Sequence, residues 1–200
     1  CAVPLEHLAD YTSAITELFH RHGTRGTWYA HASVGCLHVR PILNIKSEGG
    51  VKAMRAIADE AVELVRRFNG SYSGEHGDGI SRSEFIAPMF GSQLTSAFGE
   101  VKAAFDPQAR LNPGKIVDAP RFDDRSLMRF YPEYSAIELK QTALDWSEWG
   151  GFAGAVEMCN NNGACRSHAA GVMCPSWRAT REEQHVTRGR ANTLRLAISG

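Results

Sequence analysis

The stretch that decides the fold is TWYAHASVGCLHVR, residues 27–40. Aromatic and β-branched residues lie on both sides of Ser33-Val34-Gly35, a pattern typical of two strands joined by a turn. Helical periodicity surrounds this stretch on both sides. The alternation of helical and extended patterns over residues 1–117 predicts an α+β domain.

Three helices are expected around the strand pair. The first has apolar residues at helical spacing from Leu8 to Phe19 and closes at Gly23. The second runs from about Val51 to Phe68, and Asn69-Gly70 ends it. The third spans about Glu84 to Phe105 with a bend at Gly91, and Asp106-Pro107 stops it.

The pattern weakens after the first domain. Residues 118–149 are charged and aromatic and contain Pro120 and Pro132, which indicates a linker between domains. A second, mostly helical domain is expected to begin at residue 150 and to be incomplete at residue 200. Thr180-Arg181-Glu182-Glu183 has the form of a capping box, and a final helix presents Ala191, Leu194 and Ile198.

Composition excludes several functions. The 22 basic residues balance the 22 acidic ones, so no overall field attracts nucleic acid or an anionic membrane. No apolar run has the length of a membrane span, and the start at Cys1 without Met or a leader indicates a piece of a longer protein. Five unevenly spaced cysteines favour a reducing, cytoplasmic compartment, with association at the cytoplasmic face of a membrane left open.

His31 and His38 stand seven residues apart. On one continuous strand this odd separation would place them on opposite faces, so they can meet only if the chain turns between them, and Gly35 allows that turn. Imidazole binds Zn²⁺, Fe²⁺ or Mn²⁺, and a carboxylate on a stiff loop would complete the set. The alternative is that both histidines are structural.

The loop Ser73-Gly74-Glu75-His76-Gly77-Asp78-Gly79 offers that carboxylate. Its three glycines let the backbone approach a ligand closely, and Glu75 stands beside His76, a potential base. Taken alone, Glu75-His76 is equally consistent with a solvated loop.

Residues 26–41, the 73–79 loop and Leu111-Asn112-Pro113-Gly114-Lys115-Ile116 together resemble the C-terminal substrate (cap) domain of the FAD-linked oxidases. That family includes D-lactate dehydrogenases, the D subunit of glycolate oxidase and D-2-hydroxyglutarate dehydrogenases. The resemblance covers about residues 1–117. It implies an antiparallel sheet with helices packed on one face, and an FAD-binding domain that precedes Cys1.

The resemblance also implies roles for single residues. His31, His38 and Glu75 would bind a divalent metal, Zn or else Fe or Mn, and His76 would be the catalytic base. Arg40 extends from the ligand strand and could fix a substrate carboxylate bidentately, or else form an interdomain ion pair. The Asn112 to Lys115 turn resembles the part that approaches the flavin, although a plain turn is the alternative for Lys115.

Cys159, Cys165 and Cys174 form a second constellation, in which Cys174 is followed by Pro175. Cys-Pro is the ending of ferredoxin-type cluster motifs, but the spacings here are looser, and zinc-binding or structural thiols remain alternatives. The surrounding residues resemble the junction at which large bacterial proteins fuse the FAD oxidase to an iron–sulfur domain. A [4Fe-4S] cluster would need ligands beyond Gly200.

The sequence thus predicts a fragment of an FAD-dependent D-2-hydroxy-acid dehydrogenase. Electrons would pass from a small 2-hydroxy acid (D-lactate, glycolate or D-2-hydroxyglutarate) to FAD, then through clusters to a quinone or a carrier protein. The alternatives are a non-catalytic electron-transfer subunit and a structural zinc protein.

Overall fold

A computed structural model describes residues 1–168 and 173–199. The chain divides into two compact units, Cys1–Pro132 and Glu133–Gly200. The expected linker, residues 118–149, extends across this division.

The decisive stretch forms an antiparallel hairpin of β1 (Gly26–His31) and β2 (Cys36–Pro41). A short 3-10 turn, η2 (Ala32–Val34), joins the strands, and Gly35 follows it with φ of +68°. This left-handed conformation is one that glycine adopts without steric cost. The prediction of two strands joined by a turn at Gly35 is therefore confirmed.

The N-terminal segment continues the sheet beyond β2. Ala2 forms isolated antiparallel bridges with Cys36 on one side and with Ser71 on the other. The chain that follows the second long helix is thereby held beside the N-terminal segment, which lies between it and β2. This pairing places the glycine-rich loop, which starts two residues after Ser71, next to the hairpin.

The first long helix, α1 (Leu8–Arg21), follows the 3-10 turn η1 (Leu5–His7). Gly23 has φ of +66°, the Gly23 N–H donates to the His20 carbonyl and the Thr24 N–H donates to the Phe19 carbonyl. These two bonds are the Schellman pattern expected of a glycine that ends a helix. The predicted end of this helix is confirmed.

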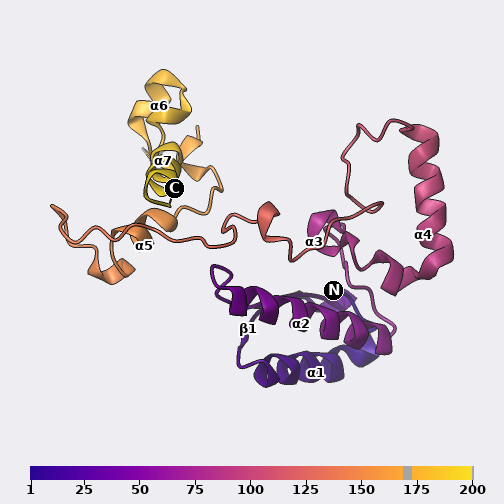
Figure 1. Ribbon diagram of the computed structural model, residues 1–200. Coiled ribbons are helices and arrows are strands. Elements are labelled where there is room, and N and C mark those ends of the chain that lie inside the picture. The colour runs from indigo at the N-terminus through magenta and orange to yellow at the C-terminus, as the bar shows by residue number, and fades with distance from the viewer. Residues whose placement is uncertain (169–172, 200) are drawn as a thin grey trace. The chain divides into compact units, whose positions relative to one another are not determined.

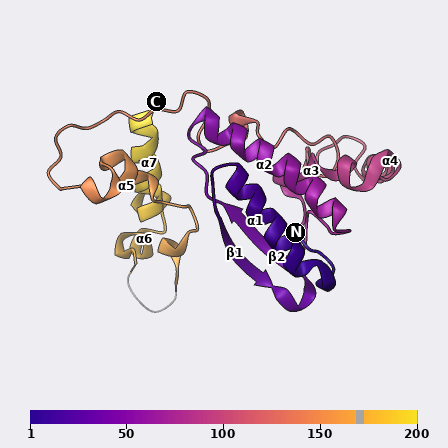
Figure 2. The same ribbon diagram turned by 90° about the horizontal axis from the view of Figure 1, so that it is seen from below.

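The second long helix, α2 (Glu48–Arg67), begins three residues before the predicted start because the Ser47 side chain accepts a hydrogen bond from the Gly50 N–H and caps it. Asn69, with φ of +53°, follows its end. Figures 1 and 2 show α1 and α2 side by side next to the hairpin. The first core joins α1, α2 and β2 through Val3, Tyr11, Ile15, Leu18, Phe19, Leu37, Ile57, Ala61 and Val65.

Burial of these side chains stabilises the first unit, since each fully buried large apolar residue contributes about 1.5–3 kcal/mol. Leu37 and the half-buried Val39 point from β2 into this core. Alternation along the strand then directs Cys36, His38 and Arg40 to the other face of the sheet. The α+β fold with helices on one face of an antiparallel sheet is confirmed for these two strands.

A short helix, α3 (Gly79–Ser83), and a long one, α4 (Ile86–Phe105), follow the glycine-rich loop. Gly91 breaks α4 with φ of +80° and ψ of +168°, which confirms the predicted bend. The 3-10 turn η3 (Arg125–Leu127) lies near the end of the first unit. Figure 1 shows α4 extending away from α3.

The regular elements in the described residues of the second unit are all helical. Its small core contains Cys174, Trp177 and Val186, with Cys165 packed against it. The capping-box prediction at Thr180 was wrong: Thr180 is the last residue of a helix, and Arg181 follows it with φ of +64°. The elements are η4 (Ser147–Trp149), α5 (Phe152–Glu157), η5 (Ala164–Arg166), α6 (Pro175–Thr180), η6 (Glu183–His185) and α7 (Thr187–Ser199).

No described helix combines the length and the apolar character that crossing a membrane requires.

Candidate active site

The hairpin register explains how two histidines seven residues apart share a face. His31 pairs with Cys36, and Tyr29 pairs with His38. Directly opposed residues of an antiparallel pair point to the same side, and so do residues two apart on one strand. His31, Cys36 and His38 therefore lie on one face, opposite the side of β2 that joins the helical core.

The loop between α2 and α3 carries the carboxylate to this face. A Cβ atom at Gly74 would lie 2.9 Å from Sγ of Cys36 and 3.1 Å from the Cys1 carbonyl oxygen. Only a residue without a side chain allows the loop to approach the sheet this closely. Glu75 and His76 follow directly and thereby reach the two histidines.

Three imidazoles converge on the Glu75 carboxylate. The Nε2 atom of His38 lies 2.7 Å from Oε1 of Glu75, and Nε2 of His76 lies 3.0 Å from the same oxygen. The Nε2 atom of His31 lies 3.6 Å from Oε2. His38 is the most buried of the four, whereas the His76 side chain is 63% exposed.

His31, His38 and Glu75 form a group whose ligand atoms all lie within 4.8 Å of one another. Within the described residues, no other set of three or more His, Cys, Asp or Glu side chains meets this spacing. His76 lies beside this group and is not part of it. The structure thus brings together the three predicted metal ligands and the predicted base.

The Nε2 atom of His38 is buried and makes no hydrogen bond to any described residue. Its 2.7 Å approach to Glu75 therefore lacks hydrogen-bond geometry. A buried nitrogen without a hydrogen-bond partner is costly, and a bound cation would satisfy it. The donor set of two imidazoles and one carboxylate is one that Zn²⁺ accepts in enzymes.

Two arginines extend the site. Arg40 and Arg82 line one cavity of about 270 Å³ together with His38, Glu75 and His76. Arg82 donates to the Gly77 carbonyl oxygen at 3.3 Å. Among the described residues, neither guanidinium has an ion pair with a carboxylate, which leaves both free to attract an anion.

Sequence reasoning identified Arg40 but missed Arg82 and Tyr29. The Tyr29 ring centroid lies 4.8 Å from that of His38 and 5.6 Å from that of His31, and the residue is 61% exposed. Period-two alternation from His31 already placed Tyr29 on the ligand face. Arg82 has no such signal, because its position depends on the fold of α3 against the loop.

Asn112 and Lys115 lie apart from the histidine cluster in the sequence, on an exposed turn after α4. Asn112 has φ of +47° and Gly114 has φ of +75°. The start of this turn is fixed by Asp106, which accepts hydrogen bonds from the backbone N–H groups of Arg110 and Leu111. The hydrogen bonds from Lys102 and from Leu111 lower the pKa of Asp106 to about 2.

The three cysteines of the second unit do not gather around one point in the described part of the chain. Cys174 is buried against Trp177, whereas Cys159 and Cys165 are partly exposed. Burial by itself would raise the pKa of the Cys174 thiol, but hydrogen bonds with the Trp177 backbone and the Thr187 hydroxyl outweigh it and lower that pKa.

Residues 1–116 match the family described as FAD linked oxidases, C-terminal domain. The chain therefore belongs to the FAD-linked oxidase family.

Particular relatives refine this assignment. The D-2-hydroxyglutarate dehydrogenase of Pseudomonas putida is 40% identical over 195 residues, which are 97% of this chain and 19% of that protein. The protein of the same name from Escherichia coli is 38% identical over 200 residues, covering 96% of this chain and 19% of that protein. Glycolate oxidase subunit GlcD of E. coli is 31% identical over 115 residues, 58% of this chain and 23% of the subunit. The chain spans about a fifth of the length of the two dehydrogenases.

Proposed function

We propose that this chain supplies the metal-binding and proton-accepting side of the active site of an FAD-dependent 2-hydroxy-acid dehydrogenase. The observation that carries the proposal is the convergence of the His31, His38 and His76 imidazoles on the Glu75 carboxylate. The family membership supports the redox chemistry.

His31, His38 and Glu75 would hold the divalent cation. Their spacing, the buried and unsatisfied Nε2 of His38 and the donor types all favour Zn²⁺, with Fe²⁺ or Mn²⁺ as alternatives. A bound cation would supply Lewis-acid polarisation of a substrate hydroxyl, and a bound flavin would supply a hydride acceptor.

His76 takes the hydroxyl proton. A neutral imidazole is the side chain that most often serves as a general base. The exposure of His76 leaves room for a substrate hydroxyl beside the cluster. Arg40 pairs with a substrate carboxylate and orients C2, and Asn112 and Lys115 approach the flavin from the turn after α4. The main FAD-binding domain belongs to another part of the full-length protein.

The substrate that we favour is a 2-hydroxy dicarboxylate of the D-2-hydroxyglutarate type. The dehydrogenases named for that substrate match nearly the whole chain, whereas the glycolate oxidase subunit matches only 58% of it. Arg40 and Arg82 offer two guanidinium groups, enough for a second carboxylate.

The second unit would carry electrons onward. Cys159, Cys165 and Cys174 would ligate [4Fe-4S] iron together with cysteines from elsewhere in the full-length protein, and a quinone or a carrier protein would be the final acceptor. The buried Cys174 with its lowered pKa is suited to a thiolate ligand.

The decisive experiment replaces the base in the full-length protein. His76→Asn should abolish flavin reduction by D-2-hydroxyglutarate while metal content and FAD content stay at the wild-type level. His22→Asn, at a histidine paired with Glu60 on the helical side, is the matched control and should leave the rate unchanged. Unchanged flavin reduction in His76→Asn would remove the catalytic role and favour a non-catalytic electron-transfer subunit.

A separate experiment decides the role of the cysteine segment. Anaerobic reconstitution of the full-length protein with iron and sulfide should give brown iron–sulfur absorbance, and Cys174→Ala should diminish it. Zinc in this segment with no such absorbance would instead support a structural zinc site.

A further inference from the structure

Two neighbouring residues at the end of α3 hold the segment that returns from α4. We call residues 111–123 the return segment; it contains the Asn112 to Lys115 turn. Ser83, which is buried, accepts a hydrogen bond at Oγ from the Ile116 N–H at 2.8 Å. Glu84 accepts one at Oε2 from the Phe122 N–H at 2.9 Å. The return segment is thus fastened at two points to the helix that follows the Glu75-His76 loop.

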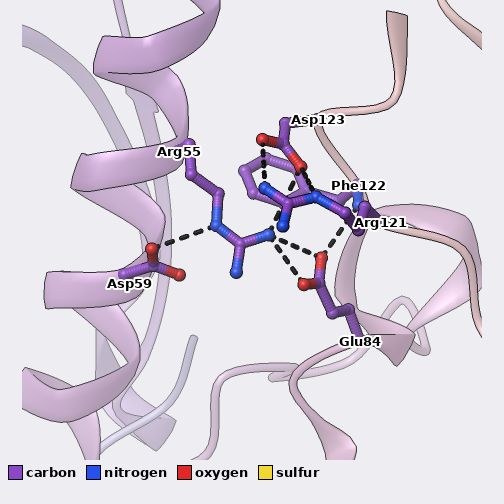
Figure 3. A network of polar contacts seen from close by, with 6 residues as sticks. All are labelled: Arg55, Asp59, Glu84, Arg121, Phe122 and Asp123. Carbon is purple, nitrogen blue, oxygen red and sulfur yellow. Dashed lines mark hydrogen bonds and ion pairs between the residues drawn. The ribbon is translucent and has the colours of Figure 1, made fainter.

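Arg55 of α2 connects Glu84 to the far end of the return segment, as Figure 3 shows. Its Nη1 atom lies 2.7 and 2.8 Å from the two carboxylate oxygens of Glu84, and 3.4 Å from Oδ1 of Asp123. Its Nε atom donates to Asp59, one turn further along α2, at 3.0 Å. Glu84 therefore receives two bonds from Arg55 of α2 and one from the return segment.

The surroundings exclude much of the water that would weaken these ion pairs. The Arg55, Glu84 and Asp123 side chains are 23%, 22% and 16% exposed. The Arg55 guanidinium lies 5.5 Å from the Phe85 and Phe122 ring centroids. Burial alone would lower the pKa of Arg55, but its bonds with Glu84 and Asp59 outweigh this effect and raise that pKa above its ordinary value. Partly buried charge-assisted bonds of this kind are stronger than exposed pairs.

The return segment is held in a conformation that its residues disfavour. Ile116 has φ of +65° and Asp118 has φ of +53°. Positive φ is a genuine outlier for a β-branched residue, and such a conformation persists only where surrounding contacts enforce it. Here the Ile116 N–H is the group that Ser83 binds.

We propose that Ser83, Glu84 and Arg55 are positioning residues that fix the Asn112 to Lys115 turn relative to the Glu75-His76 loop. This inference rests on the proposed function, in which the loop holds the proton acceptor and the turn approaches the flavin. Oxidation of a 2-hydroxy acid requires the C2 hydrogen to face the flavin while the hydroxyl faces the base. The helix α3 directly follows the Glu75-His76 loop, and Ser83 and Glu84 at its end bind the return segment. These two contacts therefore set the distance between the loop and the Asn112 to Lys115 turn.

The test uses the full-length protein loaded with FAD and metal. Glu84→Ala should lower kcat by about 10-fold to 100-fold, the size expected for a misplacement of about 1 Å, with KM little changed. The deuterium isotope effect on kcat with 2-deuterated substrate should rise, because hydride transfer becomes limiting. Glu84→Gln keeps an oxygen for the Phe122 N–H and should recover part of the rate. Metal content should equal that of the wild type.

A second readout does not depend on turnover. Hydrogen exchange at the Ile116 and Phe122 amides should accelerate in Glu84→Ala and in Ser83→Ala, while the amides of β1 and β2 keep their protection. The visible spectrum of bound FAD should also shift. Arg55→Met should likewise accelerate exchange at the Phe122 amide and shift the FAD spectrum. Arg21→Met, which removes the exposed ion pair between α1 and Glu60 of α2, is its matched control and should change neither.

The outcomes separate the two proposals. If wild-type protein oxidises no 2-hydroxy acid, the proposed function fails, and the exchange and spectral readouts still decide whether these residues position the turn. Unchanged exchange and an unchanged FAD spectrum in Glu84→Ala would overturn the inference. A loss of rate in Glu84→Ala that accompanies a loss of metal would also overturn the inference, since it would indicate a general structural defect.

Discussion

Gly35 lies so close to Val3 that a Cβ atom at position 35 would stand 2.0 Å from the Val3 carbonyl oxygen. The turn between β1 and β2 therefore packs directly against the backbone of the N-terminal segment. Gly35→Ala should therefore destabilise the hairpin by more than the roughly 1–2 kcal/mol that the left-handed conformation alone costs, and it should lower zinc affinity. Urea unfolding and zinc titration measure the two effects.

Gly23→Ala is the control for this prediction. Gly23 has nearly the same φ, +66°, but a Cβ atom there would point into open space, with no other atom within 4 Å. The alanine variant at this position should show only the conformational cost and normal zinc binding. Equal losses in both variants would contradict the steric role of Val3.

Removal of one imidazole should empty the cation site. His38→Ala is expected to reduce zinc bound per chain to near zero, because His38 provides the most buried nitrogen of the three proposed ligands. Elemental analysis after dialysis against a chelator measures this. His22→Ala should retain the wild-type zinc content, and retention of zinc by His38→Ala would refute the assignment of His38.

Arg40 should discriminate between substrates. Arg40→Met is expected to raise KM for D-2-hydroxyglutarate by roughly 10-fold to 100-fold, since a charge-assisted bond is worth about 1.5–3 kcal/mol. The effect on D-lactate, which lacks a second carboxylate, should be smaller if Arg40 binds that group. Equal effects on both acids would instead place Arg40 at the carboxylate next to C2. Steady-state kinetics with the two acids give the comparison.

Asp106 should make the turn after α4 sensitive to acid. Hydrogen bonds from Lys102 and Leu111 lower its pKa from 3.8 to about 2. A carboxylate with a lowered folded-state pKa stabilises the fold above its unfolded value, and that stability is lost as the pH falls through the folded value. The stability advantage over Asp106→Asn should thus be complete above about pH 4 and vanish toward about pH 2. Urea unfolding across this range tests the sign, and an advantage that grows with acid would refute it.

The parts of the fold that the sequence predicted correctly depend on local signals. The hairpin follows from Gly35 and the flanking β-branched and aromatic residues, and the end of α1 follows from Gly23. Local alternation allows His31 and His38 to share a face if the chain turns between them, and the register of the hairpin decides that they do. The sequence pattern predicts a start of α2 that is too late, because the first three residues after the cap Ser47 (48–50) show no apolar periodicity.

The remaining features depend on contacts between distant residues. No spacing in the sequence indicates that Arg55 binds Glu84, or that Ser83 holds Ile116. Arg82 reaches the cavity only because α3 folds back beside the loop. The prediction at Thr180 failed for a different reason. Residues 180–183 have the residue types of a helix start, but α6 begins at Pro175 and ends at Thr180.

Gly91 separates α4 into two stretches whose helical phase is independent. No atom from outside the local backbone lies within 4 Å of the Cβ position at Gly91, so the break reflects backbone conformation and not crowding. If the stretch of α4 after Gly91 is rotated or lengthened, the orientation of Phe85 and Ile86, which are buried in the first unit, therefore stays the same. A change in the length of the distal stretch would therefore leave the geometry at the base of α3 unchanged.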